Sequence, residues 1–197
     1  MLTAVGARVL FTTLVAWVAA QRLWELRRSA ENERALRALG AVEHAPEQMP
    51  VMRALHAMWL VSMIVEVWVL HRVAPLSVFL VATAVFVVGQ TLRGAAMHAL
   101  GVRWSVRILT LPHAPRVTSG MFRWLRHPNY LGVALELAAL PLMGGAWITA
   151  IGASVLNAAL MAWRIPVEER ALREAASAPR IAPALPSILS DAPRSEA

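Results

Sequence analysis

Long runs of apolar residues, separated by clusters of arginine, set the strongest limit on how this chain can fold. A helix needs roughly 20 apolar residues to cross the hydrocarbon core of a membrane. Three of the runs meet that length, whereas the fourth is shorter and ends at Gly144-Gly145. The five runs are residues 2–20, 51–70, 76–99, 131–143 and 146–163. The pattern therefore predicts an all-α, polytopic membrane protein with five transmembrane helices.

The composition agrees with a membrane protein. Hydrophobic residues make up 58% of the chain and charged residues 16%, whereas soluble domains are near half apolar and a quarter charged. The chain has no cysteine, which excludes disulfides and thiolate metal ligands, and we expect no metal site. The net charge is +7, but the basic residues lie beside apolar runs, so we expect no nucleic-acid partner.

The placement of arginine predicts the orientation of the chain. Arginines cluster after the first, third and fifth runs, and the other side carries only Arg72, apart from Arg8 within the first run. Cytoplasmic loops are enriched in arginine, so the N-terminus should lie outside and the C-terminus in the cytoplasm. The clustered residues are Arg22, Arg27, Arg28, Arg34, Arg37, Arg103, Arg107, Arg116, Arg123, Arg126, Arg164, Arg170 and Arg173.

The first run has a second interpretation, as a cleaved signal peptide. Val18-Ala19-Ala20 is similar to a cleavage site. However, no basic cluster precedes the run, and cleavage would export the arginine-rich loop that follows it. A retained helix is the better interpretation.

The last two runs are predicted to form a helical hairpin, with Pro141 and the glycine pair at its turn. A tight hairpin brings its two ends together. One end is preceded by the polar residues 126–130, and the other is followed by residues 164–169. We therefore expect these two polar segments to face each other at the cytoplasmic surface.

The polar segments contain side chains suited to binding and proton transfer. His127 and Tyr130 can donate and accept hydrogen bonds, and His127 is a possible base. Arg164 can fix an anionic group through forked hydrogen bonds. Glu168 lies four residues later and shares its face if the helix continues through Pro166. Taken singly, these residues fit interfacial anchors or a solvated helix face equally well. Their presence at both ends of one hairpin favours a site.

The two segments resemble the isoprenylcysteine carboxyl methyltransferase family. The resemblance lies in Gly120-x-Phe122-x-x-x-Arg126-His127-Pro128-Asn129-Tyr130-x-Gly132, followed by Arg164-Ile165-x-x-Glu168-Glu169-x-x-Leu172, and it covers residues 100–172. Phe122 stands where the family usually has tyrosine, so this position offers no hydroxyl for a polar contact with the cofactor. Residues 22–26, 29, 32–33, 40–43 and His56 are similar to a bacterial branch that methylates alkylpyrones or alkylresorcinols.

The resemblance implies a membrane methyltransferase that uses S-adenosylmethionine (SAM). The methyl acceptor would be an oxygen, as carboxylate or acidic hydroxyl, of a lipophilic substrate drawn from membrane lipid. The site would face the cytoplasm, at the bacterial inner membrane. Arg164 and Glu169 would lie near the methyl acceptor as catalytic residues. The implied cofactor-binding residues are Leu111, His113, His127, Pro128, Asn129, Tyr130 and Glu168.

Ionisable residues inside the apolar runs are candidates for the wall of a substrate tunnel, because such residues are costly in lipid unless paired or hydrated. They are His56, Glu66, Arg93 and Glu136. For Glu66, a structural hydrogen bond to another helix is an equal alternative.

The chain divides into three regions on these criteria. Residues 1–99 would hold three membrane helices and an amphipathic cytoplasmic loop, residues 100–175 the catalytic region, and residues 176–197 a disordered Ala/Pro/Ser-rich tail. Alternative functions are a phospholipid or small-amine N-methyltransferase, a sterol-reductase-like protein, and a non-enzymatic membrane scaffold or transporter subunit. The sequence fixes neither the methyl acceptor nor the oligomeric state.

Overall fold

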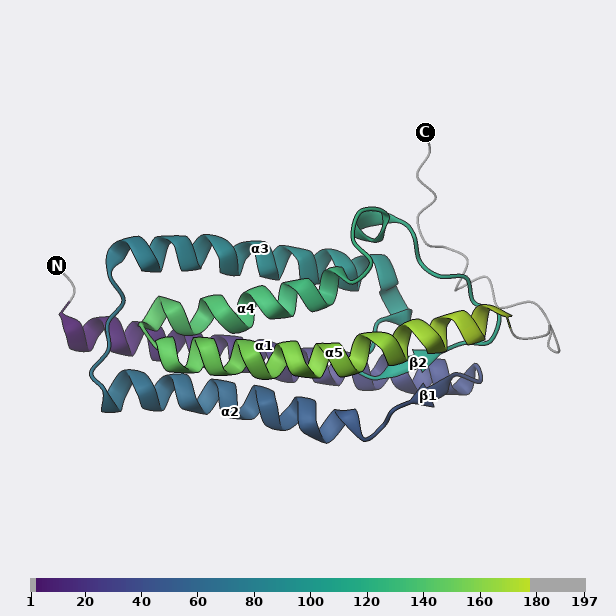
Figure 1. Ribbon diagram of the computed structural model, residues 1–197, viewed down its shortest axis with the longest axis horizontal. Coiled ribbons are helices and arrows are strands. Elements are labelled where there is room, and N and C mark those ends of the chain that lie inside the picture. The colour runs from purple at the N-terminus through teal and green to yellow at the C-terminus, as the bar shows by residue number, and fades with distance from the viewer. Residues whose placement is uncertain (1–2, 178–197) are drawn as a thin grey trace.

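The computed structural model describes residues 3–177, which are mostly helical (Figure 1). The tail was predicted for residues 176–197, and its residues after Ser177 lie outside the described part of the chain. The five main helices are α1 (Ala4–Ala38), α2 (Gln48–Val69), α3 (Leu76–Leu100), α4 (Pro128–Gly144) and α5 (Trp147–Ser177). Two short 3-10 helices, η1 (Gly101–Arg103) and η2 (Gly120–Arg123), lie between α3 and α4.

The structure is mostly helical, as predicted, and contains one short two-stranded sheet in addition. Strand β1 (Val42–His44) pairs antiparallel with β2 (Ile108–Thr110), so that Val42 lies opposite Thr110. The strands are three residues each and carry no periodic pattern long enough to be recognised. Their pairing fastens the segment after α1 to the segment after α3.

Four of the described helices, α1, α2, α3 and α5, are long and apolar enough to cross a membrane. Helix α4 has 17 residues and is shorter. Large apolar side chains such as Val61, Leu76 and Ile151 remain more than half exposed on the outside of the bundle. Apolar surface on this scale is typical of contact with lipid rather than with water. The protein is therefore an integral membrane protein with several apolar helices.

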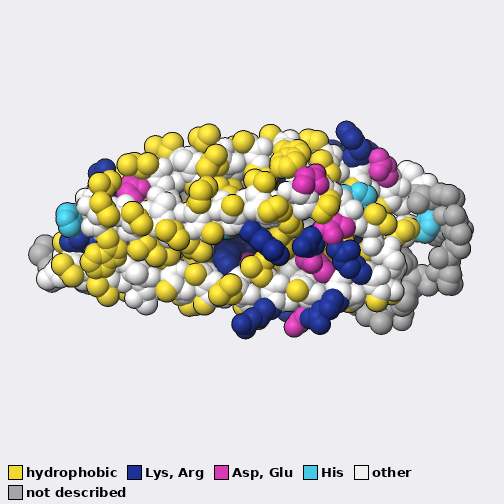
Figure 2. All heavy atoms as spheres, turned by 90° about the horizontal axis from the view of Figure 1, so that it is seen from below, with side chains coloured by type: hydrophobic (Ala, Val, Ile, Leu, Met, Phe, Trp, Pro, Cys, Tyr) yellow, Lys and Arg dark blue, Asp and Glu magenta, His cyan; other side chains and the backbone are white. Residues whose placement is uncertain are grey.

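The two ends of the bundle differ. The α2–α3 and α4–α5 connections lie at one end with the start of α1, whereas both strands and η2 lie toward the other (Figure 1). Hydrophobic side chains cover most of one half of the face in Figure 2, and charged side chains gather from its middle toward the end that carries the strands. The polar segments of the sequence therefore share one end of the molecule.

Helices α4 and α5 are joined by Gly145 and Ala146 and contact each other. Gly145 has a φ of +79° and lies against the backbone of Val73 and Ala74, where a Cβ atom would come within 3.1 Å. Only glycine suits both requirements. The chain can therefore reverse here within two residues.

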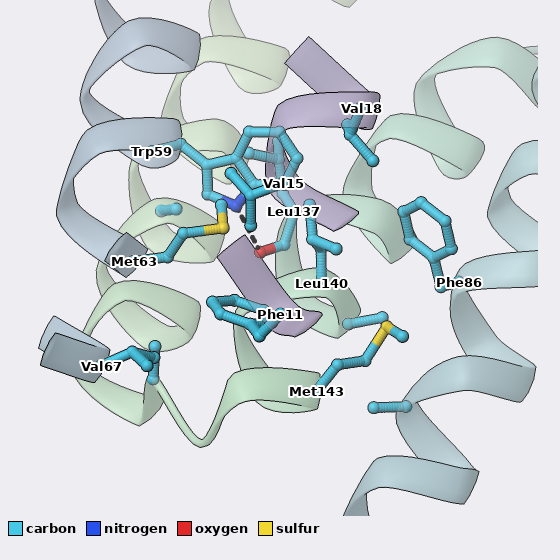
Figure 3. Close-up of a cluster of buried hydrophobic side chains, with 14 residues drawn as sticks. Phe11, Val15, Val18, Trp59, Met63, Val67, Phe86, Leu137, Leu140 and Met143 are labelled. Atoms are coloured by element: carbon cyan, nitrogen blue, oxygen red, sulfur yellow. Dashed lines mark hydrogen bonds between the residues drawn. The ribbon is translucent and has the colours of Figure 1, made fainter. Parts of the chain in front are cut away.

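Pro141 lies inside α4, not at the turn as the sequence predicted. A proline within a helix leaves the carbonyl four residues earlier without its usual donor. That carbonyl belongs to Leu137, and it accepts a hydrogen bond of 3.1 Å from the indole N–H of Trp59 on α2 (Figure 3). The donor from α2 satisfies the carbonyl, so α4 continues for another turn.

The hydrophobic core lies where α1, α2, α3 and α4 meet (Figure 3). Helix α1 contributes Phe11, Val15 and Val18, so the first apolar run is part of the packed bundle. The other labelled side chains of this core are Trp59, Met63, Val67, Phe86, Leu137, Leu140 and Met143.

Helices α3 and α4 approach so closely that two glycines are required. A Cβ atom on Gly132 would lie 2.5 Å from Cγ of Arg93 and 2.7 Å from the carbonyl oxygen of Gly89. A Cβ atom on Gly89 would in turn lie 2.9 Å from the carbonyl oxygen of Gly132. Small residues allow such backbone contact between membrane helices.

Replacing Gly132 with alanine should therefore force α3 and α4 apart and destabilise the protein by about 1–3 kcal/mol, the usual effect of overpacking. Gly94→Ala on α3 is the matched control, because no atom lies within 4 Å of a Cβ at that position. The control should be neutral or slightly stabilising, since alanine favours helix over glycine. Thermal unfolding in detergent measures the stability of both variants. Equal unfolding midpoints for Gly132→Ala and Gly94→Ala would contradict the close contact between α3 and α4.

Candidate functional site

Residues 126–130 and 164–169 meet at the polar end of the bundle, as the sequence predicted. Pro128 is the first residue of α4, a position where its missing N–H has no helical partner to lose. Helix α5 continues through Pro166 to Ser177, so Arg164 and Glu168 lie one turn apart on the same helix. The N–H of His113 donates to the carbonyl of Ala175 at 2.9 Å, which holds the loop after β2 against the end of α5.

His127 lies between two carboxylates of α5. Its Nε2 is 2.9 Å from Oε1 of Glu169, and its Nδ1 is 3.9 Å from Oε2 of Glu168. The imidazole is stacked on the ring of Tyr130, with 5.5 Å between the ring centroids. The first turn of α4 is thereby joined to α5 at the point where both leave the apolar part of the bundle.

Arg164 is 3% exposed and bonds only to neutral groups. Its Nε donates to the hydroxyl of Tyr130 at 2.9 Å, and one terminal nitrogen donates to the carbonyl of Val106 at 2.7 Å. The other terminal nitrogen lies 3.4 Å from Oε1 of Gln48. Within residues 3–177, Arg164 forms no ion pair. The site therefore holds a buried positive charge that no carboxylate contacts.

Glu169 is held by Arg116 from the loop before η2. Both carboxylate oxygens accept from the guanidinium, at 3.1 and 2.7 Å. The hydrogen bonds and charge of Arg116, together with the contact to His127, lower the pKa of Glu169 to about 2. Glu169 is therefore ionised throughout the physiological range and is a weak proton acceptor.

This pKa predicts a pH-dependent effect of Glu169→Gln. A carboxylate whose folded pKa is depressed adds stability above its unfolded pKa, near 4.3, and loses it as the pH falls toward the folded value. The variant should thus melt below the wild type at pH 7, and the difference should shrink as the pH falls from about 4 toward 2. The exposed Glu174→Gln is the control. A difference in melting temperature that stays constant down to pH 2 would contradict the assignment.

A partly enclosed cavity of about 120 Å³ lies beside this cluster. Three polar atoms of its lining residues are buried and have no hydrogen-bond partner among the described residues: Nε1 of Trp104, Oδ1 of Asn129 and Oε2 of Glu168. Buried polar groups are nearly always paired, so unpaired donors and acceptors around one cavity point to a ligand.

Six of the seven predicted cofactor-binding residues line this cavity: Leu111, His127, Pro128, Asn129, Tyr130 and Glu168. His113 does not line it and has a positive φ of 64° in the adjoining loop. Arg164 and Glu169, predicted near the methyl acceptor, also lie outside the lining. Arg164 lies behind Tyr130, and Glu169 lines a neighbouring surface hollow with Arg116.

Sequence reasoning missed three residues of the site. Arg116 was grouped with the arginines that were predicted to face the cytoplasm, and its contact with Glu169 joins positions 53 residues apart. Trp104 lies within residues 100–172, which the resemblance covers, but no sequence pattern assigned it a role in the site. Gln48 is fully buried beside Arg164, but a glutamine at the start of an apolar run gives little signal of that role.

Glu66 lies at the other end of the bundle and is not part of this cavity. Its carboxylate accepts from the backbone N–H groups of Ile148 and Thr149 at 3.0 and 2.8 Å, and from the hydroxyl of Thr149 at 2.9 Å. These N–H groups belong to the first turn of α5 and have no partner within the helix. Of the two interpretations of Glu66, the structure favours the structural one.

Arg93 and Glu136 belong to a buried network with Arg22 and Glu25 that connects α1, α3 and α4. Glu25 accepts from Arg22 and from Arg93 at 2.6 Å in both cases. Glu136 pairs with Arg93 at 3.1 Å and also with Arg22. Two positive and two negative charges thus neutralise one another between the helices. Arg93 and Glu136, which were predicted to line a substrate tunnel, do not line the cavity beside His127.

His56, the remaining tunnel candidate, lies half-buried on α2. Its Nδ1 is 2.9 Å from the carbonyl of Met52, and its ring meets Trp59 edge-on. It does not line the cavity either.

Comparison with known proteins agrees with the motifs. Residues 80–174, from α3 to near the end of α5, match the isoprenylcysteine carboxyl methyltransferase (ICMT) family. The uncharacterized protein YpbQ of Bacillus subtilis is 33% identical over 165 residues, which cover 84% of this chain and 98% of YpbQ. The chain belongs to the ICMT family. An uncharacterized protein of Haemophilus influenzae is 27% identical over 158 residues, or 80% of this chain and 91% of the relative. No solved structure shows significant similarity to this chain.

Membership of the ICMT family confirms the resemblance stated from the motifs and indicates a membrane methyltransferase. The matched segment contains both polar segments and most of the cavity lining. The more specific similarity to the alkylpyrone and alkylresorcinol branch stays a prediction.

Proposed function

We propose that this ICMT-family protein transfers a methyl group from SAM to an oxygen of a lipophilic substrate at the cytoplasmic face of a bacterial inner membrane. The proposal includes five membrane spans, the last two as a helical hairpin, with the N-terminus outside. The observation that carries it is the buried Arg164 guanidinium, which bonds only to neutral groups beside a cavity with unpaired polar atoms.

The charge of Arg164 favours an anionic methyl acceptor. A buried charge is costly unless it is paired, and a guanidinium has five N–H donors, of which three have partners here. A carboxylate or an acidic hydroxyl would neutralise the charge and use the remaining donors. An amine would add a second positive charge, so the N-methyltransferase alternative fits this centre less well.

The residues around the cavity suit the polar parts of SAM. The ammonium and ribose hydroxyls of the cofactor are hydrogen-bond donors, and Oε2 of Glu168 and Oδ1 of Asn129 are unpaired acceptors. The indole N–H of Trp104 is an unpaired donor that suits the cofactor's carboxylate or a base nitrogen. When bound, the cofactor supplies a sulfonium methyl group that is already activated for transfer.

The chain's own residues would then act by positioning and by accepting a proton where one is released. A carboxylate acceptor releases none. For an acidic hydroxyl, we assign the proton to Nδ1 of His127. The ionised Glu169 lies 2.9 Å from Nε2, which favours the tautomer with hydrogen on Nε2 and leaves Nδ1 as the acceptor. Glu169 is thus a positioning residue, held in turn by Arg116.

Calorimetric titration with SAM tests the proposed cofactor site. Glu168→Gln should weaken SAM binding by about tenfold or more, because a hydrogen bond to a charged group contributes about 1.5–3 kcal/mol. Glu174→Gln, an exposed change two turns further along α5, should bind SAM as the wild type does. Failure of the wild type to bind SAM, or equal affinities for wild type and Glu168→Gln, would contradict the proposal.

A further inference from the structure

A lateral groove extends from the candidate site between α4 and α5. It begins at His127 and Tyr130 and reaches Ala134, Ser154 and Asn157 deeper in the bundle. Five of its nine lining residues are apolar, and two of these, Leu131 and Ala158, are exposed on the outside of the bundle. The groove therefore connects the site to the apolar surface where lipid chains lie.

Asn157 is the one polar residue of this groove that is buried, whereas His127, Tyr130 and Ser154 are half-buried. Asn157 is 3% exposed, and its Oδ1 is buried without a hydrogen-bond partner in residues 3–177. The nine other buried polar or charged residues in that range all form side-chain hydrogen bonds or ion pairs. They are Glu25, Ser29, Gln48, Glu66, Arg93, Thr110, Glu136, Thr149 and Arg164.

An unpaired amide in an apolar region is costly, so its presence calls for a partner that arrives with a ligand. Ser154, one turn earlier on α5, lines the same groove and forms no side-chain hydrogen bond within the described chain. By contrast Ser62, Thr83 and Thr91 in other helices each donate to a carbonyl four residues earlier. The deep end of the groove thus offers two polar groups side by side.

We propose that the chain of the lipid substrate lies in this groove and that Asn157, with Ser154, binds a hydroxyl group on that chain. The inference rests on the proposed function, and it deepens it by naming a substrate class. A hydroxyl suits an amide because it can both donate to Oδ1 and accept from the amide nitrogen. Asn157 precedes Arg164 by seven residues, about 10 Å along the helix. The hydroxyl therefore lies about that far from the methyl-accepting group.

Binding of three tritiated fatty acids to the purified protein in detergent tests this. The probes are 10-hydroxyoctadecanoate, octadecanoate and 2-hydroxyoctadecanoate, whose hydroxyl is too near the carboxylate to reach Asn157. The wild type should bind the 10-hydroxy acid about tenfold more tightly than the other two. Asn157→Leu should lose that preference, and Ser154→Ala should reduce it. Thr91→Val, a polar-to-apolar change on the exposed side of α3, should retain it.

Equal binding of the three acids by the wild type would overturn the inference, as would an unchanged preference in both groove variants. Adding labelled SAM to the same samples separates this result from the proposed function. A binding preference that depends on Asn157, with no methyl transfer to any of the acids or to lipid extract, supports the groove site and contradicts the proposed function. Methyl transfer at equal rates to the 10-hydroxy and unsubstituted acids, unchanged in Asn157→Leu, supports the proposed function and overturns the inference.

Discussion

Arg164→Ala is expected to lower kcat by about a thousandfold while the affinity for SAM stays within about threefold of the wild type. The guanidinium supplies the buried positive charge beside Tyr130, and its removal would leave an anionic methyl acceptor without its counter-charge. The polar atoms assigned to the cofactor belong to Trp104, Asn129 and Glu168, which the change does not touch. Turnover and calorimetric titration on the same preparation measure the two quantities separately.

Two further variants show which property of Arg164 matters. Arg164→Lys keeps the charge but loses the planar fork, so its kcat should lie between those of alanine and arginine. Tyr130→Phe removes the hydroxyl that accepts from Nε while keeping the ring beside His127. It should affect turnover less than Arg164→Ala does. The division of roles would be wrong if Arg164→Ala abolished SAM binding or kept normal turnover.

Glu136→Leu is expected to destabilise the protein by about 3–5 kcal/mol, because removing one partner of a buried ion pair leaves an uncompensated charge. The network would then hold Arg22 and Arg93 against Glu25 alone. The double variant Arg93→Met/Glu136→Leu removes one charge of each sign and leaves the Arg22–Glu25 pair. It should be markedly more stable than Glu136→Leu, although it contains more changes.

Thermal unfolding of both variants and of Arg93→Met completes a double-mutant cycle. If the single Glu136 variant melted no lower than the double variant, the carboxylate would not be balancing the buried arginines. SAM affinity in whichever variants fold should equal that of the wild type, since neither residue lines the cavity. If a folded Glu136 variant no longer bound SAM, Glu136 would instead belong to the functional site.

Much of the architecture could be predicted because membrane helices are specified by local sequence. Apolar length located α2, α3 and α4 within a few residues, together with the starts of α1 and α5. Helices α1 and α5 continue well beyond their apolar runs, to Ala38 and Ser177. The joining of the two polar segments also followed from the predicted hairpin, although the chain reverses at Gly145 and Ala146 rather than at Gly144-Gly145. His127 and Glu169 are indeed 2.9 Å apart although they lie 42 positions apart in the sequence.

Features that depend on a partner far along the chain could not be predicted. Pro141 continues the helix only because Trp59 satisfies the carbonyl that it leaves free. The strands form only because β1 and β2 meet. Glu66 was recognised as a costly residue, but its role as the cap of α5 depends on the packing of α2 against α5. In each case the local sequence indicates that a group needs a partner, but it does not indicate which residue that partner is.

Transfer of a labelled methyl group tests the central claim most directly. Purified protein in lipid nanodiscs, methyl-tritiated SAM and a lipid extract from the source cells are incubated together, and the lipids are separated. We predict label on an oxygen of one lipid class, as a methyl ester or methyl ether, with none formed by Arg164→Ala. Absence of label from every lipid, or label on nitrogen, would contradict the account.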